Sequence, residues 1–273
     1  PSLYGRALVA RFLDPPPGDA EESDSLDTAG DGRTEGLWLV AGPTGSGKTT
    51  TLHALLRARV RAGEKVLSVE DPVEALLPGV HQVSVGSPPG MGFALALRAF
   101  LRQSPDCLLV GEIRDEETAG VALQAARTGH RILSTLHARN NAGVLRRFAD
   151  LGQSPDALLG LRPVVLHQRL LPRLCPRCRR TEPLPANWRQ ALEALGLEAP
   201  DRIPARGSCP LCREGVAGRL PVRSSGIFVP GRDSDRELLL AGWEAVLAGR
   251  IAPGALAPLL PGDLRRRFAL SGP

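Results

Sequence analysis

The sequence predicts an α/β fold with a mostly parallel sheet that is covered by helices on both faces. Two observations support this prediction. From residue 37 onward, short apolar runs typical of buried strands alternate with segments of helical periodicity. Residues 42–49 read GPTGSGKT, a glycine-rich loop that joins one of these strands to one of these helices. Strands joined through helices run in the same direction, so we expect ligands to bind at their shared carboxyl ends.

The predicted elements alternate regularly along this part of the chain. Strands are expected over 37–41, 65–69, 107–110 and 131–135. Helices are expected over 48–62, 93–103, 115–128, 140–150 and 154–168. The first helix illustrates the pattern, because Leu52, Leu55 and Leu56 recur at helical spacing before Gly63. Together these elements form a predicted core over 37–170.

Changes in composition divide the rest of the chain into four predicted segments. Residues 1–14 contain one strand, which we expect to end a preceding domain, because the sequence begins with Pro1 and not with a methionine. Residues 15–36 are rich in Pro, Gly and acidic residues, cannot bury a core, and are expected to form a flexible linker. A module rich in Cys, Pro and Arg follows over 171–219, and the C-terminal region 220–273 is expected to be helical.

The composition narrows the possible functions. The chain has 273 residues, with 34 Lys or Arg against 29 Asp or Glu, for a net charge of +5. The arginines are spread along the whole chain and only 4% of the residues are aromatic, so nucleic acid is not the expected partner. No apolar run approaches the roughly 18 residues of a membrane span, and no signal peptide opens the sequence. We therefore expect a cytoplasmic protein.

The glycine-rich loop is a predicted binding site for the phosphates of a nucleotide. Glycines allow successive backbone N–H groups to turn toward a polyphosphate, and the helix that follows directs the positive end of its dipole at the same place. Lys48 is expected to contact the phosphates, and the only other lysine among the 34 basic residues is Lys65. The Thr49 hydroxyl is expected to bind Mg²⁺. The predicted nucleotide-binding residues are Gly42, Pro43, Thr44, Gly45, Ser46, Gly47, Lys48, Thr49 and Thr50.

Polar side chains follow three other predicted strands. Glu70, Glu112 and His137 come shortly after the second, third and fourth strands. Because the carboxyl ends of parallel strands meet at one edge of the sheet, we expect these side chains to face the phosphate-binding loop. Hydrolysis needs a carboxylate to orient or deprotonate water, and cations to neutralise the transferred phosphoryl group. Acidic residues after a strand can instead cap the next helix, and we favour that role for Asp115 and Glu116.

Four of the five cysteines form two pairs. Cys175-x-x-Cys178 and Cys209-x-x-Cys212 each place two thiolates on one knuckle, and two knuckles complete the tetrahedral shell suited to Zn²⁺. A shell of four protein ligands leaves no open position, which favours a structural metal. Two unrelated reduced pairs are the alternative. Cys107 lies in a predicted buried strand, where we expect it to pack.

Several segments together resemble the signature motifs of the secretion ATPase superfamily. They are GPTGSGKTTT at 42–51, VEDPVE at 69–74, LRAFLRQSPD at 97–106, VGEIRD at 110–115, TGH at 128–130 and STLH at 134–137. They follow one another in the order of the family, whose nearest members are the type II secretion ATPase and the type IV pilus-assembly ATPase. The resemblance implies a RecA-like P-loop NTPase core with a small four-cysteine zinc module and a helical C-terminal tail.

The resemblance also implies roles for individual residues. Glu70 matches an acidic residue proposed to activate water, and Glu112 matches the family's Walker B glutamate, which acts on the metal and water. His130 and His137 fall in a histidine box thought to sense the γ-phosphate. Three arginines match residues that reach phosphates or a neighbouring subunit: Arg98, Arg102 and Arg114. The alternative for the first two is an ordinary pair one turn apart on a helix surface.

The function implied by the resemblance is ATP hydrolysis in a hexameric ring that drives pseudopilus assembly in type II protein secretion. The expected partners are other copies of the chain and inner-membrane platform proteins, with acidic phospholipid as a further candidate. The protein would be cytoplasmic and peripheral to the inner membrane. Type IV pilus assembly is an alternative, because both classes carry the four cysteines. A nucleic-acid translocase and a non-hydrolysing scaffold are alternatives of other classes.

Overall fold

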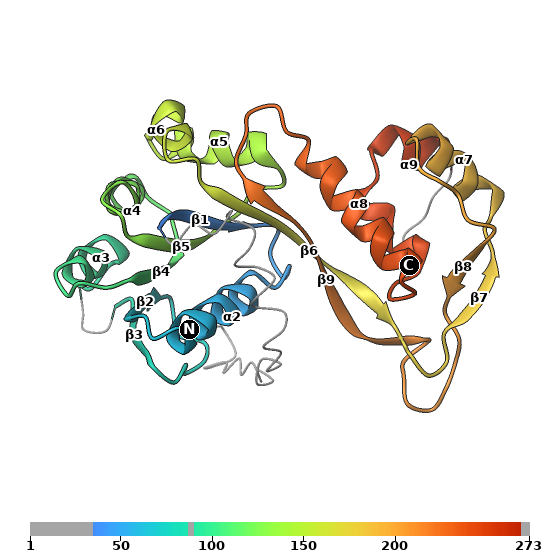
Figure 1. Cartoon of the computed structure of the whole chain (residues 1–273), viewed down its shortest axis with the longest axis horizontal. Coiled ribbons are helices and arrows are strands. Elements are labelled where there is room, and N and C mark those ends of the chain that lie inside the picture. The colour runs from blue at the N-terminus through green and yellow to red at the C-terminus, as the bar shows by residue number, and fades with distance from the viewer. Residues whose placement is uncertain (1–34, 87–89, 269–273) are drawn as a thin grey trace, which may run out of the picture.

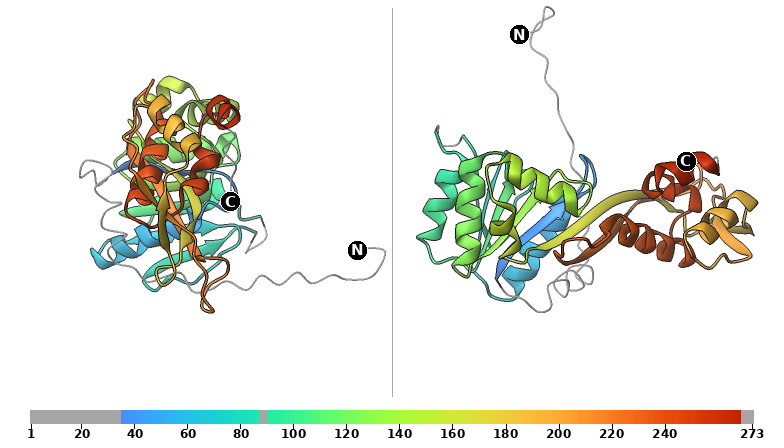
Figure 2. Two further views of the ribbon diagram at one scale, coloured as in Figure 1. Left: turned by 90° about the vertical axis from the view of Figure 1, so that its right-hand side faces the viewer. Right: turned by 90° about the horizontal axis from the view of Figure 1, so that it is seen from above.

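The computed structural model describes residues 35–86 and 90–268. The strand expected within 1–14, and all but the end of the linker expected over 15–36, lie outside the described residues. The described chain forms two lobes, each with its own buried apolar residues, and a long two-stranded hairpin joins them (Figure 1). Seen from above, the lobes lie at opposite ends of this hairpin (Figure 2).

The first lobe is built on a seven-stranded sheet with the order β3-β2-β4-β5-β1-β6-β9. Its strands are β1 (Gly36–Ala41), β2 (Val66–Glu70), β3 (Val80–Ser84), β4 (Cys107–Glu112), β5 (Arg131–Leu136), β6 (Val164–Leu174) and β9 (Val216–Ile227). The first six are parallel, and only β9 runs antiparallel to its neighbour β6. The mostly parallel sheet expected from the sequence is therefore confirmed.

Helices cover both faces of this sheet (Figure 1). On one face lies α2 (Lys48–Arg61). On the other lie α3 (Phe93–Leu101), α4 (Glu116–Arg127), α5 (Asn141–Asp150) and α6 (Pro155–Leu159). Side chains of β1 alternate between the two faces of the sheet. Leu37 and Leu39 pack on the α3–α6 side, and Trp38 and Val40 pack on the α2 side. All four are almost completely buried, as is typical of a central parallel strand.

The strands and helices predicted between residues 37 and 150 are confirmed with small shifts at their ends. The helix predicted over 154–168 is wrong, because α6 ends at Leu159 and β6 begins at Val164. The apolar start of β6 is buried between β1 and β9, and a short run buried on both faces has no period that separates a strand from a helix. The sequence also gave no sign of β3, a short edge strand with partly exposed side chains.

The second lobe packs around the far half of the hairpin that β6 and β9 form beyond the sheet. Its other elements are β7 (Arg180–Pro183), α7 (Ala186–Ala194), β8 (Arg202–Ala205), α8 (Ser234–Leu247), the 3-10 helix η2 (Pro253–Leu259) and α9 (Gly262–Arg267). Trp188 and Trp243 are buried in its core. The predicted boundaries after residues 170 and 219 fall inside β6 and β9. Within the described parts of the chain, no helix combines the length and apolar character needed to cross a membrane.

Candidate nucleotide-binding site

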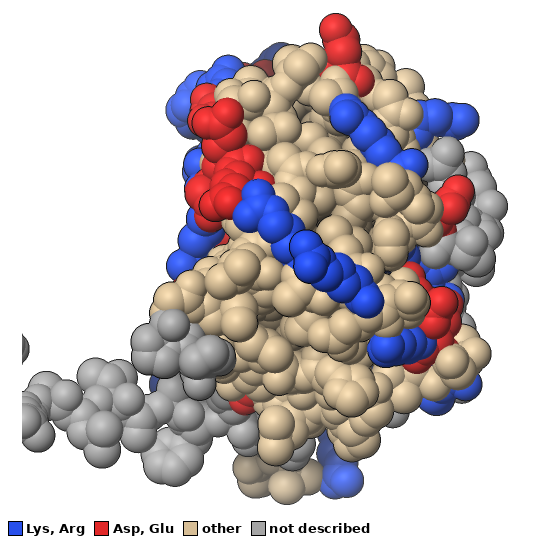
Figure 3. Space-filling model, turned by 90° about the vertical axis from the view of Figure 1, so that its left-hand side faces the viewer, with Lys and Arg blue, Asp and Glu red and all other residues tan. Residues whose placement is uncertain are grey.

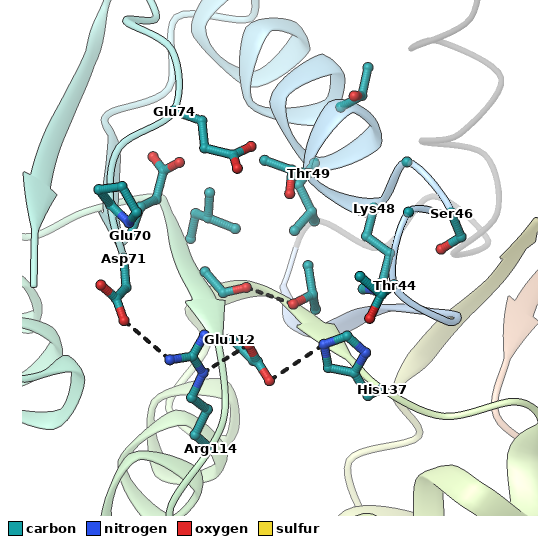
Figure 4. A pocket seen from close by; sticks show the side chains of 18 of the residues that line it. Thr44, Ser46, Lys48, Thr49, Glu70, Asp71, Glu74, Glu112, Arg114 and His137 are labelled. Atoms are coloured by element: carbon teal, nitrogen blue, oxygen red, sulfur yellow. Dashed lines mark hydrogen bonds and ion pairs between the residues drawn. The ribbon is translucent and has the colours of Figure 1, made fainter. Parts of the chain in front are cut away.

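A cleft of about 500 Å³ opens at the carboxyl ends of the parallel strands. Its walls come from the glycine-rich loop, the start of α2 and the residues that follow β2, β4 and β5 (Figure 4). Loop residues 44–50 therefore share one cleft with Glu70, Glu112, Arg114 and His137. This is the edge at which parallel α/β sheets bind their ligands.

Backbone geometry makes the loop suitable for an anion. Gly45 and Gly47 have φ angles of 75° and 84°, a left-handed conformation that a β-carbon disfavours. The helix α2 begins directly afterwards at Lys48, so the N–H groups of its first turn have no partner within the helix. An anion at the loop would meet several backbone donors together with the positive end of the helix dipole.

Lys48 is buried at the base of this loop. Its Nζ donates hydrogen bonds to the carbonyl oxygens of Gly42 and Pro43, at 3.1 and 3.0 Å, although these two residues do not line the cleft themselves. Burial lowers the pKa of the Lys48 ammonium, the charge of Glu112 acts in the opposite direction, and Arg169 adds to the lowering. Among the described residues Lys48 forms no ion pair, so an incoming polyphosphate would be its first anionic partner.

Glu70 ends β2 with its carboxylate held by three donors. His53 Nε2 lies 3.1 Å from one oxygen, while Ser68 Oγ and Gln82 Nε2 donate to the other at 2.8 and 3.0 Å. Only 4% of the residue is exposed. Burial by itself would raise the pKa of the Glu70 carboxyl, but the hydrogen bonds from His53, Gln82 and Ser68 outweigh it and lower the pKa. Glu70 is therefore a fixed negative charge in the wall of the cleft.

Glu112 ends β4 and lies between two nitrogen-bearing side chains. One oxygen accepts a hydrogen bond from Arg114 Nε at 2.9 Å, and the other lies 3.7 Å from His137 Nε2. Arg114 also contacts Asp71 at 3.1 Å. The hydrogen bond and charge of Glu112, with a further contribution from Asp71, raise the pKa of the Arg114 guanidinium. These contacts leave the Glu112 carboxylate facing the cleft with a permanent cation beside it (Figure 4).

Comparison with known proteins assigns the chain to a family. Residues 20–234 match the family model described as "Type II/IV secretion system protein". The chain belongs to this family. A type II secretion system protein E of Klebsiella pneumoniae is 45% identical over 208 residues, which are 71% of this chain and 40% of that protein. The type IV pilus assembly ATPase PilB of Acinetobacter baylyi is 39% identical over 236 residues, 81% of this chain and 40% of that protein.

The resemblance to secretion and pilus-assembly ATPases is therefore confirmed, and the chain spans less than half the length of these relatives. The fold is shared with a solved structure of the pilus retraction motor PilT with bound ADP, at a TM-score of 0.62 and 23% identity. That match covers 96% of this chain and 71% of the PilT chain. It confirms the predicted ATPase fold class of the type II/IV secretion family.

Some residues that the secretion-family motifs suggested lie outside the cleft. Arg98 on α3 pairs with Glu117 on α4 at 2.6 Å, and both side chains are at least half exposed. Arg102 is exposed at the end of α3. Figure 3 shows the face of the molecule that lies on the left in Figure 1. This face is mostly uncharged and carries a short row of basic side chains with acidic side chains beside it. The imidazole of His130 contacts Thr128 and the carbonyl oxygen of Ala125 near the end of α4. A role for Arg98 and Arg102 at phosphates or a neighbouring subunit, and a role for His130 in sensing the γ-phosphate, stay predictions.

The structure adds residues to the cleft that sequence reasoning missed. His53, Ser68 and Gln82 fix Glu70, and Arg219 of β9 lines the cleft from the hairpin. His53 carried a signal, because it is a polar residue on the buried face of α2. No sequence signal pointed to Arg219, since this residue reaches the cleft only through the pairing of β9 with β6.

The four paired cysteines of this secretion-family chain meet at one point beyond the hairpin strands. Their sulfur atoms all lie within 4.8 Å of one another, with 3.9 Å between Cys175 and Cys209 and 3.5 Å between Cys178 and Cys212. Four thiolates bound to Zn²⁺ at about 2.3 Å in a tetrahedron lie about 3.8 Å apart, so the cluster fits this metal. Backbone N–H groups of Arg177 and Cys178 contribute most to lowering the pKa of Cys175 to about 7. The separations are too long for disulfides.

Proposed function

We propose that this chain is the ATP-hydrolysing part of a type II secretion motor, which drives pseudopilus assembly at the inner membrane. The observation that carries the proposal is the convergence of Lys48, Glu70 and Glu112 with the glycine-rich loop in a member of the type II/IV secretion family. The similarity to type II secretion system protein E over most of the chain supports this choice of pathway.

ATP binding uses groups that the fold has already oriented. The triphosphate accepts hydrogen bonds from the backbone N–H groups of residues 44–50 at the start of α2. Lys48 exchanges the neutral carbonyls of Gly42 and Pro43 for the β- and γ-phosphates, which are stronger partners because they are charged. Mg²⁺, held by the Thr49 hydroxyl beside the carboxylates of the cleft, would neutralise charge on the phosphates.

Hydrolysis is assigned mainly to Glu112. About 20% of its side chain is exposed and faces the cleft, whereas Glu70 is buried beneath three donors. Glu112 is therefore the better placed carboxylate to orient or deprotonate the attacking water. Arg114 and His137 lie on either side of it, where they can stabilise the charge that develops on the transferred phosphoryl group. Glu70 keeps the opposite wall negative and in place for the metal.

The cysteine cluster is assigned a structural Zn²⁺. All four ligands come from the protein, so the metal has no open position for a substrate. Leu211, between the last two ligands, is 68% exposed and gives this knuckle an apolar tip. A rigid knuckle of this kind is suited to docking a partner protein.

Family membership supports a proposal on the oligomer, the partners and the location. We infer a hexamer at the cytoplasmic face of the inner membrane, in which Arg98 and Arg102 serve a neighbouring subunit. Inner-membrane platform proteins and acidic phospholipid are the proposed partners. Type IV pilus assembly is the second candidate, because a PilB protein is 39% identical to this chain. DNA-stimulated hydrolysis with steep salt dependence would instead favour a nucleic-acid translocase.

Phosphate release by the purified chain tests the proposal. Lys48→Ala should abolish both nucleotide binding and release, whereas Glu112→Gln should keep binding and lose at least about a hundredfold in rate. Lys65→Ala is the matched control, because the other lysine lies outside the cleft and contacts Gln103 and Asp106. Equal rates for the wild-type chain and Glu112→Gln would remove Glu112 from the mechanism. Binding without any release would favour the scaffold alternative.

A further inference from the structure

The glycine-rich loop rests on a buried glutamine that no motif singled out. Gln168 of β6 is 1% exposed. Its Nε2 donates a hydrogen bond to the carbonyl oxygen of Ser46 at 2.6 Å, and its Oε1 accepts one from Thr51 Oγ1 at 2.7 Å. One side chain thus holds both the loop and the first turns of α2.

Close packing at both ends of the loop points to the same glutamine. A β-carbon at Gly42 would lie 2.6 Å from the backbone oxygen of Gln168, and one at Gly47 would lie 2.9 Å from its Nε2. Both distances are shorter than atoms tolerate, so only glycine fits at either position. The loop therefore packs directly against β6 at Gly42 and again at Gly47.

The contact with Ser46 has a consequence for phosphate binding. In a trans peptide the carbonyl oxygen and the next N–H point in opposite directions. Gln168 holds the Ser46 carbonyl toward β6, so the N–H of Gly47, a residue that lines the cleft, points away from β6. Aligned backbone N–H groups are what such a loop offers to a phosphate, so Gln168 sets the direction of one donor.

Arg223 fixes the glutamine in turn. It is the register partner of Gln168 on β9, and its Nε donates to Gln168 Oε1 at 2.7 Å while a terminal nitrogen donates to Thr51 Oγ1 at 3.1 Å. A guanidinium can only donate, so the amide oxygen must face Arg223 and the amide nitrogen must face Ser46. Arg223 itself does not line the cleft.

We propose that Gln168 is the positioning residue of the phosphate-binding loop and that Arg223 couples the loop to the β6–β9 hairpin. The inference rests on the proposed nucleotide-binding function and extends it to residues outside the cleft. The same hairpin continues to the cysteine cluster, about 24 Å along an extended strand from Gln168 to Cys175. Nucleotide binding is therefore linked to the rigidity of the hairpin, and each stabilises the other.

Binding of a fluorescent ATP analogue to the full chain tests the positioning role. Gln168→Glu keeps an acceptor for Thr51 and Arg223 but loses the donor to Ser46, so affinity should fall about tenfold or more. Arg223→Ala should weaken binding several-fold although it touches no nucleotide, and Arg223→Lys should recover part of the loss. Gln190→Glu makes the same chemical change at an exposed position of α7 and should leave affinity unchanged.

Hydrogen exchange provides a second readout that a merely structural role would not change. Saturating nucleotide should slow exchange of the β9 amides around Arg223 in the wild-type chain and do so less in Gln168→Glu. Equal affinity for the wild-type chain, Gln168→Glu and Arg223→Ala would overturn the inference, as would a lower melting temperature with affinity kept. Failure of the wild-type chain to bind the analogue would overturn the proposed function and this inference with it.

Discussion

At the scale of single residues, burial and hydrogen bonding decide which polar groups can take part in chemistry. Glu70 and Glu112 both end a strand, yet the first is buried and held by three donors and the second faces the cleft. Asp115 takes the capping role expected of it, because its carboxylate accepts the backbone N–H of Thr118 at 2.7 Å. Burial raises the pKa of the Cys107 thiol to about 12, so this cysteine packs in the sheet as an inert group.

The buried histidine of β6 gives a prediction on pH. His167 donates from Nε2 to Asn141 Oδ1 at 2.8 Å, and burial lowers its pKa to about 4. In the unfolded chain the pKa is about 6.5, so the stabilising contribution is complete above that pH and is lost as the pH falls toward 4. Between pH 7.5 and 5.0 the wild-type chain should lose about 2 kcal/mol more stability than His167→Gln. Urea unfolding at both pH values measures this, and equal losses would contradict it.

At the scale of elements, the β6–β9 hairpin organises the second half of the molecule. The Leu174 N–H donates to the Arg250 carbonyl and so ties the far end of the hairpin to the second lobe, while the Cys175 N–H donates to the Gly215 carbonyl and joins the ends of the two strands. The guanidinium of Arg179 adds a hydrogen bond to the Gly249 carbonyl at 2.6 Å. The cysteine cluster thus lies where the hairpin meets the end of α8, and a metal there would hold these elements together.

Removal of one thiolate tests that role. Cys178→Ser should lower the zinc content from about one per chain to near zero, because a three-ligand site binds far more weakly. Fluorescence of Trp188 and Trp243 should then report unfolding of the second lobe at a lower temperature, since both lie in its core. Cys107→Ala is the control, because it removes a cysteine without removing a ligand. Zinc retained by Cys178→Ser would exclude the four-cysteine site.

At the scale of the whole molecule, the described residues make few contacts between the two lobes besides those of the hairpin. Asn140 Nδ2 donates to Asp235 at 2.8 Å, and the Asn141 N–H donates to Ser234 Oγ at 3.1 Å. Separate cores joined by polar contacts allow the lobes to move relative to each other. Leu170 and Arg219 of the hairpin line the cleft together with residues of the first lobe, so motion of the second lobe would reach a nucleotide bound there.

Exposed arginines on the first lobe give a prediction on assembly. Arg98→Ala should leave nucleotide affinity and folding stability nearly unchanged, because its pair with Glu117 is solvent-exposed and contributes little. Phosphate release per chain should rise with protein concentration in the wild-type protein, as neighbouring subunits complete the site, and should stay low in Arg98→Ala. Arg146→Ala on α5 is the matched control. Release that does not depend on concentration would contradict the assembly model.

Most strands and helices of the first lobe could be predicted because the sequence patterns that indicate them lie within short stretches of the chain. The loop at 42–49 and the helical spacing of Leu52, Leu55 and Leu56 are read within a few turns of the chain. The start of β6 could not be assigned, since a run buried on both faces suits a strand and a helix equally. The exposed position of Arg98 was likewise open, because a motif gives no direction for a side chain on a helix.

The sequence by itself determined the glycine-rich loop, the two cysteine pairs and most of the strands and helices between residues 37 and 150, because these depend on residue type and spacing. Only the tertiary structure decided that Gln168 holds the loop and that Arg223 holds Gln168. The reason is physical, because Thr51 and Gln168 are 117 positions apart and meet only through the pairing of β6 with β1 and β9. Contacts between distant strands carry no local pattern that a sequence reveals.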